Sequence, residues 1–106
     1  MTMERQTKGN FLVIIPDKKD MLEMRMQVRS QHKEGIKPLL EAGILSLGGP
    51  TLVSHRFEGE EQKINGSVIM FNEQSEDEVL KIVERDVYAK SGVWDLEKMQ
   101  ILALGF

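Results

Sequence analysis

The chain has 106 residues, of which 41% are hydrophobic and 29% are charged, and its formal net charge is −3. This length fits one domain, and the hydrophobic content disfavours a chain that is disordered throughout. The absence of cysteine excludes disulfides, thiolate metal sites and a cysteine nucleophile. With two histidines and no block of basic residues, the sequence disfavours an all-histidine zinc site and a nucleic-acid-binding protein.

The sequence also gives expectations about location and domain limits. The longest purely apolar run, Phe11–Ile15, is far shorter than the ~20 residues that span a bilayer. The polar N-terminus lacks the apolar centre of a signal peptide. We therefore expect a cytoplasmic protein with neither a membrane nor a nucleic acid as partner. Residues 1–9 are expected to form a flexible tail, and residues 10–106 a single α+β domain.

The first half of the chain predicts a strand, a helix and a second strand. Phe11–Ile15 is rich in β-branched residues and is typical of a buried strand. Apolar residues recur with a helical period from Met21 to Ala42. Alternation over Ile44–Leu47 predicts a strand that Gly48-Gly49-Pro50 breaks, and residues 51–53 could resume it.

The second half predicts a hairpin, a helix and a last strand. Residues 54–65 are polar and are expected to form the hairpin loop, followed by a strand over residues 66–71. Ser75-Glu-Asp-Glu78 is a capping box that opens an amphipathic helix. We expect irregular structure over residues 86–95 and a strand over residues 99–104.

The predicted order is β-α-β-β-α-β, the ferredoxin-like arrangement of the α+β class. Four antiparallel strands would carry both helices on one face and leave the other face bare. Because Phe11–Ile15 shows no polar alternation, both faces of this strand require burial. Two sheets packed face to face would satisfy this requirement, which predicts a homodimer or a higher homo-oligomer.

Two titratable residues fall on the apolar faces of the predicted helices. On a helical wheel His32 lies within ~20° of the apolar stripe of the first helix. Asp86 lies one turn beyond the apolar face at Val79–Val83 of the second helix. A carboxylate beside an imidazole is the arrangement of a general base with its orienting partner. The alternative is that His32 is a hydrogen-bonded core residue, which is the commoner reason for a lone histidine on such a stripe.

Arg25 and Arg29 lie four residues apart, so that they could clamp a carboxylate or phenolate ligand. For Arg25, a salt bridge to Glu23, Glu34 or Asp86 is the alternative.

Further candidates for ligand contact lie in the predicted turns. Gly49 and Pro50 could let a ligand approach the backbone closely, or they could simply form a sharp bend at the end of a strand. Asp17 follows the first strand and either faces the site or serves as a turn residue. The sequence offers no cluster of metal ligands, and we expect neither a metal nor another cofactor.

Several elements, in this order, resemble the YCII-related domain family: Phe11–Asp17, Arg25–His32, Gly43 to Pro50, Gly66–Val68 and Asp86–Val93. The resemblance covers about residues 10–104 and implies a dimeric α+β barrel. It equates His32 and Asp86 with the His–Asp pair of the family, and Arg29 with the arginine three residues before the histidine. The family usually has proline after the aspartate, where this chain has Val87.

The resemblance further implies a small enzyme acting on cyclic, often aromatic-derived molecules, as do muconolactone isomerase-like proteins and a dehydrochlorinase of chlorinated hydroquinones. The sequence thus predicts a cofactor-independent lyase or isomerase of a cyclic or phenolic metabolite. His32 would be the acid and base, Asp86 its orienting partner, and the substrate-binding residues Arg29, Arg25, Gly49, Pro50 and Asp17. The alternatives are a non-catalytic dimeric module that binds a small ligand or assists a larger enzyme, and a cofactor-free monooxygenase of the same superfamily.

Overall fold

The computed structural model describes residues 7–55 and 63–105. Residues 1–6 of the expected tail, residues 56–62 of the expected hairpin loop and residue 106 lie outside the described part. The elements in chain order are β1 (Gly9–Pro16), α1 (Leu22–Glu41), β2 (Leu45–Leu52), β3 (Ile64–Glu73), α2 (Glu76–Arg85), α3 (Val87–Lys90), the 3-10 helix η1 (Leu96–Lys98) and β4 (Gln100–Ala103).

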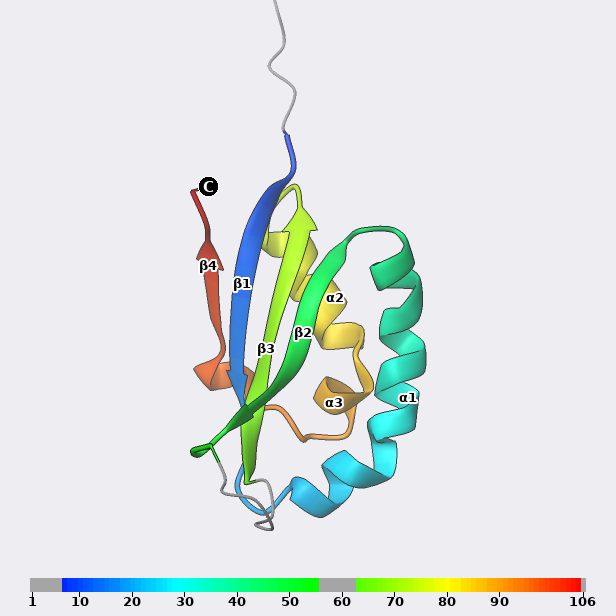
Figure 1. Cartoon of the computed structure of the whole chain (residues 1–106), viewed down its shortest axis with the longest axis vertical. Coiled ribbons are helices and arrows are strands. Elements are labelled where there is room, and N and C mark those ends of the chain that lie inside the picture. Colours follow the sequence, from blue (N-terminus) through cyan, green and yellow to red (C-terminus); the bar gives the residue numbers. More distant parts are fainter. Residues whose placement is uncertain (1–6, 56–62, 106) are drawn as a thin grey trace, which may run out of the picture.

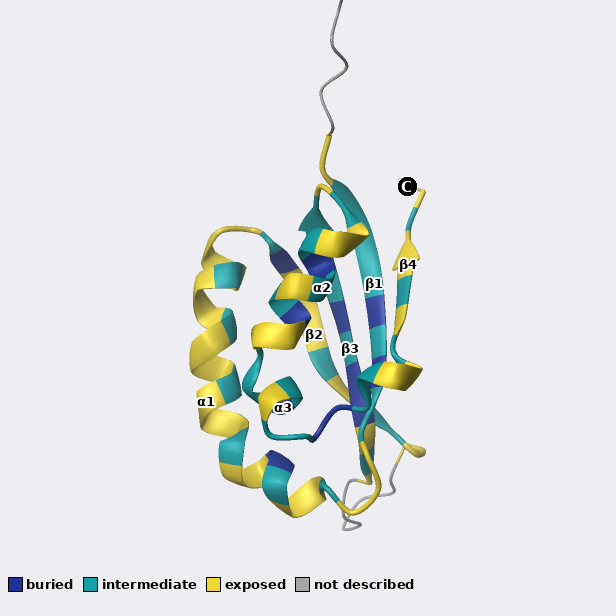
Figure 2. Cartoon of the chain, turned by 180° about the vertical axis from the view of Figure 1, so that it is seen from behind, coloured by how far each residue is buried: buried dark blue, intermediate teal, exposed yellow. Residues whose placement is uncertain are grey.

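The four strands form one antiparallel sheet in the order β2-β3-β1-β4. The helices lie on one face of this sheet, with α1 beside β2 and α2 over the central strands (Figure 1, Figure 2). The expected α+β class and the β-α-β-β-α-β order of the main elements are therefore confirmed. The prediction of irregular structure over residues 86–95 is corrected, because this segment contains the short helix α3.

The core lies between the central strands and α2 (Figure 2). Val13 and Ile15 of β1 and Phe71 of β3 are at most 1% exposed. α2 contributes Val79 and Val83, which are equally buried and lie one helical turn apart. Burying each such side chain contributes about 1.5–3 kcal/mol, so this layer supplies much of the stability.

Of the capping box predicted before α2, the Ser75 bond is present. Ser75 occupies the N-cap with an extended backbone, and its hydroxyl accepts a hydrogen bond from the backbone N–H of Glu78 at 3.2 Å. This bond satisfies one of the free N–H groups of the first turn and fixes where α2 begins.

β2 differs from the expectation, because the strand continues through Gly48-Gly49-Pro50. Pro50 pairs with Ser67 of β3, and register shifts lie at both ends of the strand. β2 is an edge strand, where a residue without an N–H is tolerated. The expected break is thus wrong, and its glycines and proline line the sheet edge beside α1.

The face of the sheet away from the helices carries an apolar patch. Side chains alternate along a strand, so the neighbours of the buried Val13 and Ile15 point to the other face. The strand register places Leu12 beside Met70 and Leu102 on that face. We call this the outer sheet patch; its members are Leu12, Ile14, Leu47, Val68, Met70 and Leu102.

Candidate functional site

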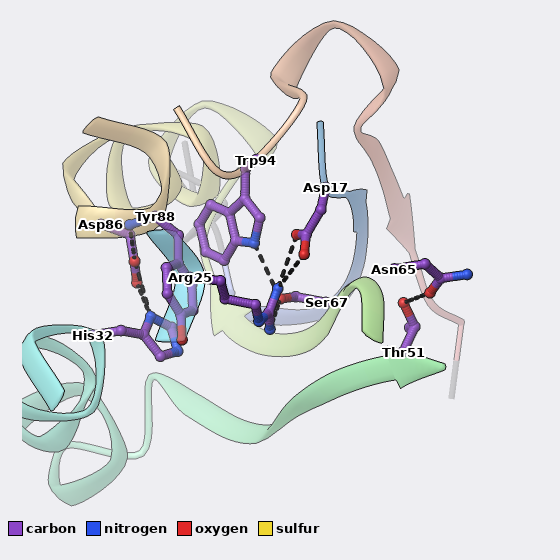
Figure 3. A network of polar contacts seen from close by, with 9 residues as sticks. All are labelled: Asp17, Arg25, His32, Thr51, Asn65, Ser67, Asp86, Tyr88 and Trp94. Carbon is purple, nitrogen blue, oxygen red and sulfur yellow. Dashed lines mark hydrogen bonds and ion pairs between the residues drawn. The ribbon is translucent and has the colours of Figure 1, made fainter. Parts of the chain in front are cut away.

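The structure brings His32, midway along α1, into contact with Asp86 at the start of α3 (Figure 3). The Nδ1 atom of His32 lies 2.8 Å and 2.9 Å from the two carboxylate oxygens, and the two side chains are 17% and 11% exposed. A carboxylate only accepts hydrogen bonds, so Nδ1 carries the proton. In the neutral imidazole the lone pair is then on Nε2, which is the arrangement that a general base requires.

Asp86 is fixed by the turn between two helices. It ends α2 and begins α3 with an extended backbone, and its Oδ1 accepts a hydrogen bond from the backbone N–H of Tyr88 at 2.9 Å. The next residue is Val87, where the family resemblance implies proline, and the cap forms all the same. The aspartate that contacts His32 is thus held by its own short helix.

Tyr88 lies in the centre of an aromatic cluster. Its ring stacks on that of His32 with centroids 4.1 Å apart and an angle of 19° between the planes. The Cζ of Arg25 lies 4.7 Å from the centroid of the same ring, and Trp94 meets it edge-on at 5.5 Å. Tyr88 is only 2% exposed, and this burial raises the pKa of its hydroxyl, against the opposing charges of Arg25 and Arg29.

Arg25 is the one buried residue of α1. Its guanidinium donates to both oxygens of Asp17, at 2.8 Å and 2.9 Å, and to Ser67 Oγ at 2.8 Å. Trp94 Nε1 donates to the same hydroxyl oxygen at 3.0 Å (Figure 3). Burial raises the pKa of the Asp17 carboxyl, and the charge and hydrogen bonds of Arg25 lower it in part. Because Arg25 forms an ion pair with Asp17, its charge is compensated inside the protein.

This network corrects two expectations. Arg25 does form a salt bridge, but its partner is Asp17 and none of the three acidic residues that the helix spacing favoured. Asp17 does not line the cleft that contains His32, because it lies behind Arg25 at the end of β1. Its place is to hold Arg25, which does line that cleft.

A cleft of about 360 Å³ lies between α1 and the strands β2 and β3, and we call it the main cleft. This volume is at the lower end for ligand pockets and suits a small ring. Its described lining includes Arg25, Arg29 and Lys33 and an imidazole but no carboxylate. Asp17 compensates Arg25, so the charges of Arg29 and Lys33 are the ones that favour an anionic ligand. The lining residues are Arg25, Met26, Arg29, His32, Lys33, Ile36, Leu45, Gly48, Gly49, Pro50, Ile64, Ser67, Ile69 and Tyr88.

Four of the five substrate-binding residues predicted from the sequence line the main cleft. Arg29 and Arg25 reach it from α1, and Gly49 and Pro50 reach it from β2. In the described part of the chain Arg29 forms no ion pair, so its charge is available to a ligand. The sequence reasoning missed Tyr88, for which the Asp-x-Tyr spacing was the available signal.

A second cleft, of about 440 Å³, lies between α1 and the α2–α3 corner. It shares His32 and Ile36 with the main cleft and also includes Asp86, Arg85 and Lys90. The His32–Asp86 pair therefore lies between the main cleft and this second cleft.

Neither a metal centre nor a membrane span is found in residues 7–55 and 63–105. No three His, Asp or Glu side chains there are grouped so that they could hold a metal ion. No helix of that part is long and apolar enough to cross a membrane.

The fold and this site define a small α+β domain with a His–Asp pair at a cleft between helix and sheet. The sequence matches the YCII-related domain over residues 10–101, and the chain belongs to this family. The dimeric α+β barrel is the broader fold expected of its members.

Two fungal relatives are named for biosynthesis. Fusaric acid biosynthesis protein 2 of Gibberella fujikuroi is 37% identical over 91 residues, which are 86% of this chain and 88% of the relative. Derivative of benzaldehyde biosynthesis cluster protein C of Emericella nidulans is 43% identical over 84 residues, or 78% and 86% of the two chains.

A similar solved structure is the 5-chloro-2-hydroxyhydroquinone dehydrochlorinase TftG of Burkholderia phenoliruptrix in complex with 2,5-dihydroxybenzoquinone. It is 26% identical and superposes with a TM-score of 0.71 over 92% of each chain. The relatives are thus connected with biosynthesis, and this structural neighbour is a dehydrochlorinase.

Proposed function

We propose that this chain is a cofactor-independent enzyme of the lyase or isomerase type that removes a proton from a small cyclic or phenolic metabolite. The observation that carries the proposal is the His32–Asp86 contact at a cationic cleft of ring size. The homodimer expected from the sequence belongs to the proposal as well, because the outer sheet patch offers it a surface.

The chemistry needs a base and a group that stabilises negative charge. Nε2 of His32 would take a proton from a carbon next to a carbonyl group, and Asp86 would keep the tautomer and stabilise the imidazolium that results. Arg29 would bind an anionic oxygen of the substrate. Loss of a leaving group then gives elimination, whereas return of the proton at another carbon gives isomerisation.

The comparisons support a ring with several oxygens as substrate. The dehydrochlorinase TftG is named for a chlorinated hydroxyhydroquinone, and its structure contains a dihydroxyquinone. Such a ring fits the volume of the main cleft, and its ionised oxygens match the cations there.

The test is turnover of 5-chloro-2-hydroxyhydroquinone, measured as the release of chloride. We expect His32→Ala and Asp86→Asn to lower kcat by about 10²–10⁴-fold, the usual contribution of a positioned acid or base. His55→Ala is the matched control, because His55 is the other histidine and is exposed outside the cleft. Circular dichroism checks that each variant folds.

Full turnover by both site variants would refute the proposal. If the wild-type chain binds 2,5-dihydroxybenzoquinone in calorimetry but turns over no cyclic substrate offered, a non-catalytic binding module becomes the better account.

A further inference from the structure

We propose that the hydroxyl of Tyr88 donates a hydrogen bond to the substrate oxygen that becomes anionic when His32 removes a proton. This inference rests on the function proposed above and adds a third catalytic residue to its site. It starts from the position of the Tyr88 ring, which stacks on His32.

The stacking places the hydroxyl near the reactive nitrogen. Nδ1 of His32 is occupied by Asp86, so Nε2 on the other edge of the ring is the atom that can act as a base. Figure 3 shows the Tyr88 hydroxyl beside the edge of the His32 ring that faces away from the Asp86 carboxylate. A substrate whose carbon approaches Nε2 therefore brings the neighbouring oxygen towards this hydroxyl.

The hydroxyl is also open to the main cleft. Tyr88 lines this cleft although it is almost wholly buried. Among the described residues, Ser91 Oγ is the one side-chain N or O atom that is both inaccessible to solvent and without a hydrogen-bond partner. The Tyr88 hydroxyl oxygen also has no partner, so it must be accessible to solvent. No described residue bonds to this hydroxyl, whereas a buried tyrosine usually has its hydroxyl bonded. An oxygen of a ligand in the cleft would supply the partner.

The electrostatic surroundings favour a neutral donor. Burial raises the pKa of Tyr88, so the hydroxyl keeps its proton at neutral pH and can donate it. Arg29, whose charge also acts on Tyr88, would balance the charge of the ligand. The two residues thus have different roles: Arg29 attracts the anionic ligand, and Tyr88 donates a hydrogen bond to the oxygen on which charge develops.

The proton-transfer step balances without another reactant. A phenolic ring reacts as its keto tautomer, in which a tetrahedral ring carbon beside the carbonyl carries the proton. His32 Nε2 takes this proton, the C–H electron pair forms a carbon–carbon double bond, and the carbonyl oxygen becomes an enolate oxygen. Tyr88 donates its hydrogen bond to this oxygen and keeps its proton. In the elimination, the enolate re-forms the carbonyl, and the pair of its carbon–carbon double bond forms a new double bond to the carbon that bears the leaving group. The leaving group departs with its own electron pair, and His32 then gives its proton to solvent.

The decisive variant is Tyr88→Phe, because it keeps the ring that stacks on His32 and the backbone N–H that holds Asp86. We expect kcat for 5-chloro-2-hydroxyhydroquinone to fall about 100-fold, as when one oxyanion donor is removed, and KM to change much less. Ser91→Ala is the control. It removes another buried hydroxyl of the same segment, outside the main cleft, and should leave kcat unchanged.

A second measurement reads the hydroxyl directly. Tyr88 is the only tyrosine of the chain, so a ¹³C label at the tyrosine Cζ, the ring carbon that bears the hydroxyl, gives a single NMR signal. Saturation with 2,5-dihydroxybenzoquinone should shift this signal in the wild-type chain and in His32→Ala alike. Full kcat in Tyr88→Phe, or an unshifted signal at saturation, would overturn the inference. Full activity in His32→Ala would instead overturn the proposed function.

Discussion

Asp86 serves two partners with one carboxylate: the ring N–H of His32 and the backbone N–H of Tyr88. The first contact sets the tautomer of the imidazole, and the second begins α3 and so positions the ring that stacks on His32. At the scale of single residues, the orientation of His32 is therefore determined by a carboxylate and a tyrosine that are two positions apart in the sequence.

The Arg25–Asp17 pair leads to a prediction about stability. Asp17→Asn removes the counter-charge of a guanidinium whose side chain is 6% exposed, so we expect a loss of about 3–5 kcal/mol in the free energy of unfolding. Urea denaturation followed by circular dichroism measures this loss.

Asp95→Asn is the matched control, because Asp95 lies 4.0 Å from the exposed Lys98. Exposed pairs of this kind contribute about 0–1 kcal/mol. If both variants unfold at nearly the same urea concentration as the wild type, the internal ion pair does not contribute as described.

The residues of the site differ in how far the sequence could predict them. His32 lies on the apolar face of α1, as its helical spacing predicted. Asp86 was predicted from a continuation of the second helix, but α2 ends at Arg85 and Asp86 reaches His32 from the extended turn before α3. The partner of Arg25 could not be found in this way, because Asp17 comes from the end of a strand and only the folded chain brings the two together. The Asp-x-Tyr spacing marked Tyr88, but not its contact with His32, because the stacking depends on α3, a helix too short to show a period.

At the scale of elements, the predictable parts are those with a strong local signal. Phe11–Ile15 and the capping box at Ser75 gave correct elements because β-branched residues and caps act locally. The prediction that β2 ends at Gly48–Pro50 was wrong. Glycine and proline are typical of the end of a strand, but at the edge of a sheet they allow strand pairing to continue.

β2 offers a prediction about cleft size. Gly48 pairs with Ile69, and a Cβ atom added there would lie 3.6 Å from Leu45 and 4.0 Å from Ile69, both of which line the main cleft. Gly48→Val should therefore fold and yet occupy part of the cleft. We expect the Kd for 2,5-dihydroxybenzoquinone to rise about tenfold or more in calorimetry, since a pocket this small has little spare room.

Gly49→Ala provides the comparison within the same strand. A Cβ atom at this position would have no atom within 4 Å, so we expect neither the fold nor the Kd to change by much. Equal binding by both variants would show that this edge of the cleft does not contact the ligand.

At the scale of the whole molecule, the outer sheet patch is the feature that one chain leaves without a partner. Leu102 is 44% exposed and Leu47 is 56% exposed, and the strand register groups them with other apolar side chains. We propose that a second copy of this chain covers the patch, as the expected dimeric α+β barrel requires. Burial of this apolar surface would drive the association.

The corresponding prediction concerns Leu102→Glu. A carboxylate on β4 within the proposed contact would be buried among apolar side chains, so we expect the dimer to dissociate about 100-fold more readily in sedimentation experiments at micromolar concentration. Leu40→Glu is the control: Leu40 is 48% exposed, like Leu102, but lies on α1. A wild-type chain that sediments as a monomer at this concentration would contradict the proposed assembly.

Trp94 has a consequence for how this protein can be studied. It is the only tryptophan of the chain, and its indole ring lies 6.0 Å from the imidazole of His32. The intrinsic fluorescence of the protein therefore originates beside the main cleft, where a quinonoid ring would quench it on binding. Collections of cyclic metabolites can thus be screened optically against the unlabelled protein, by binding alone and without a turnover assay.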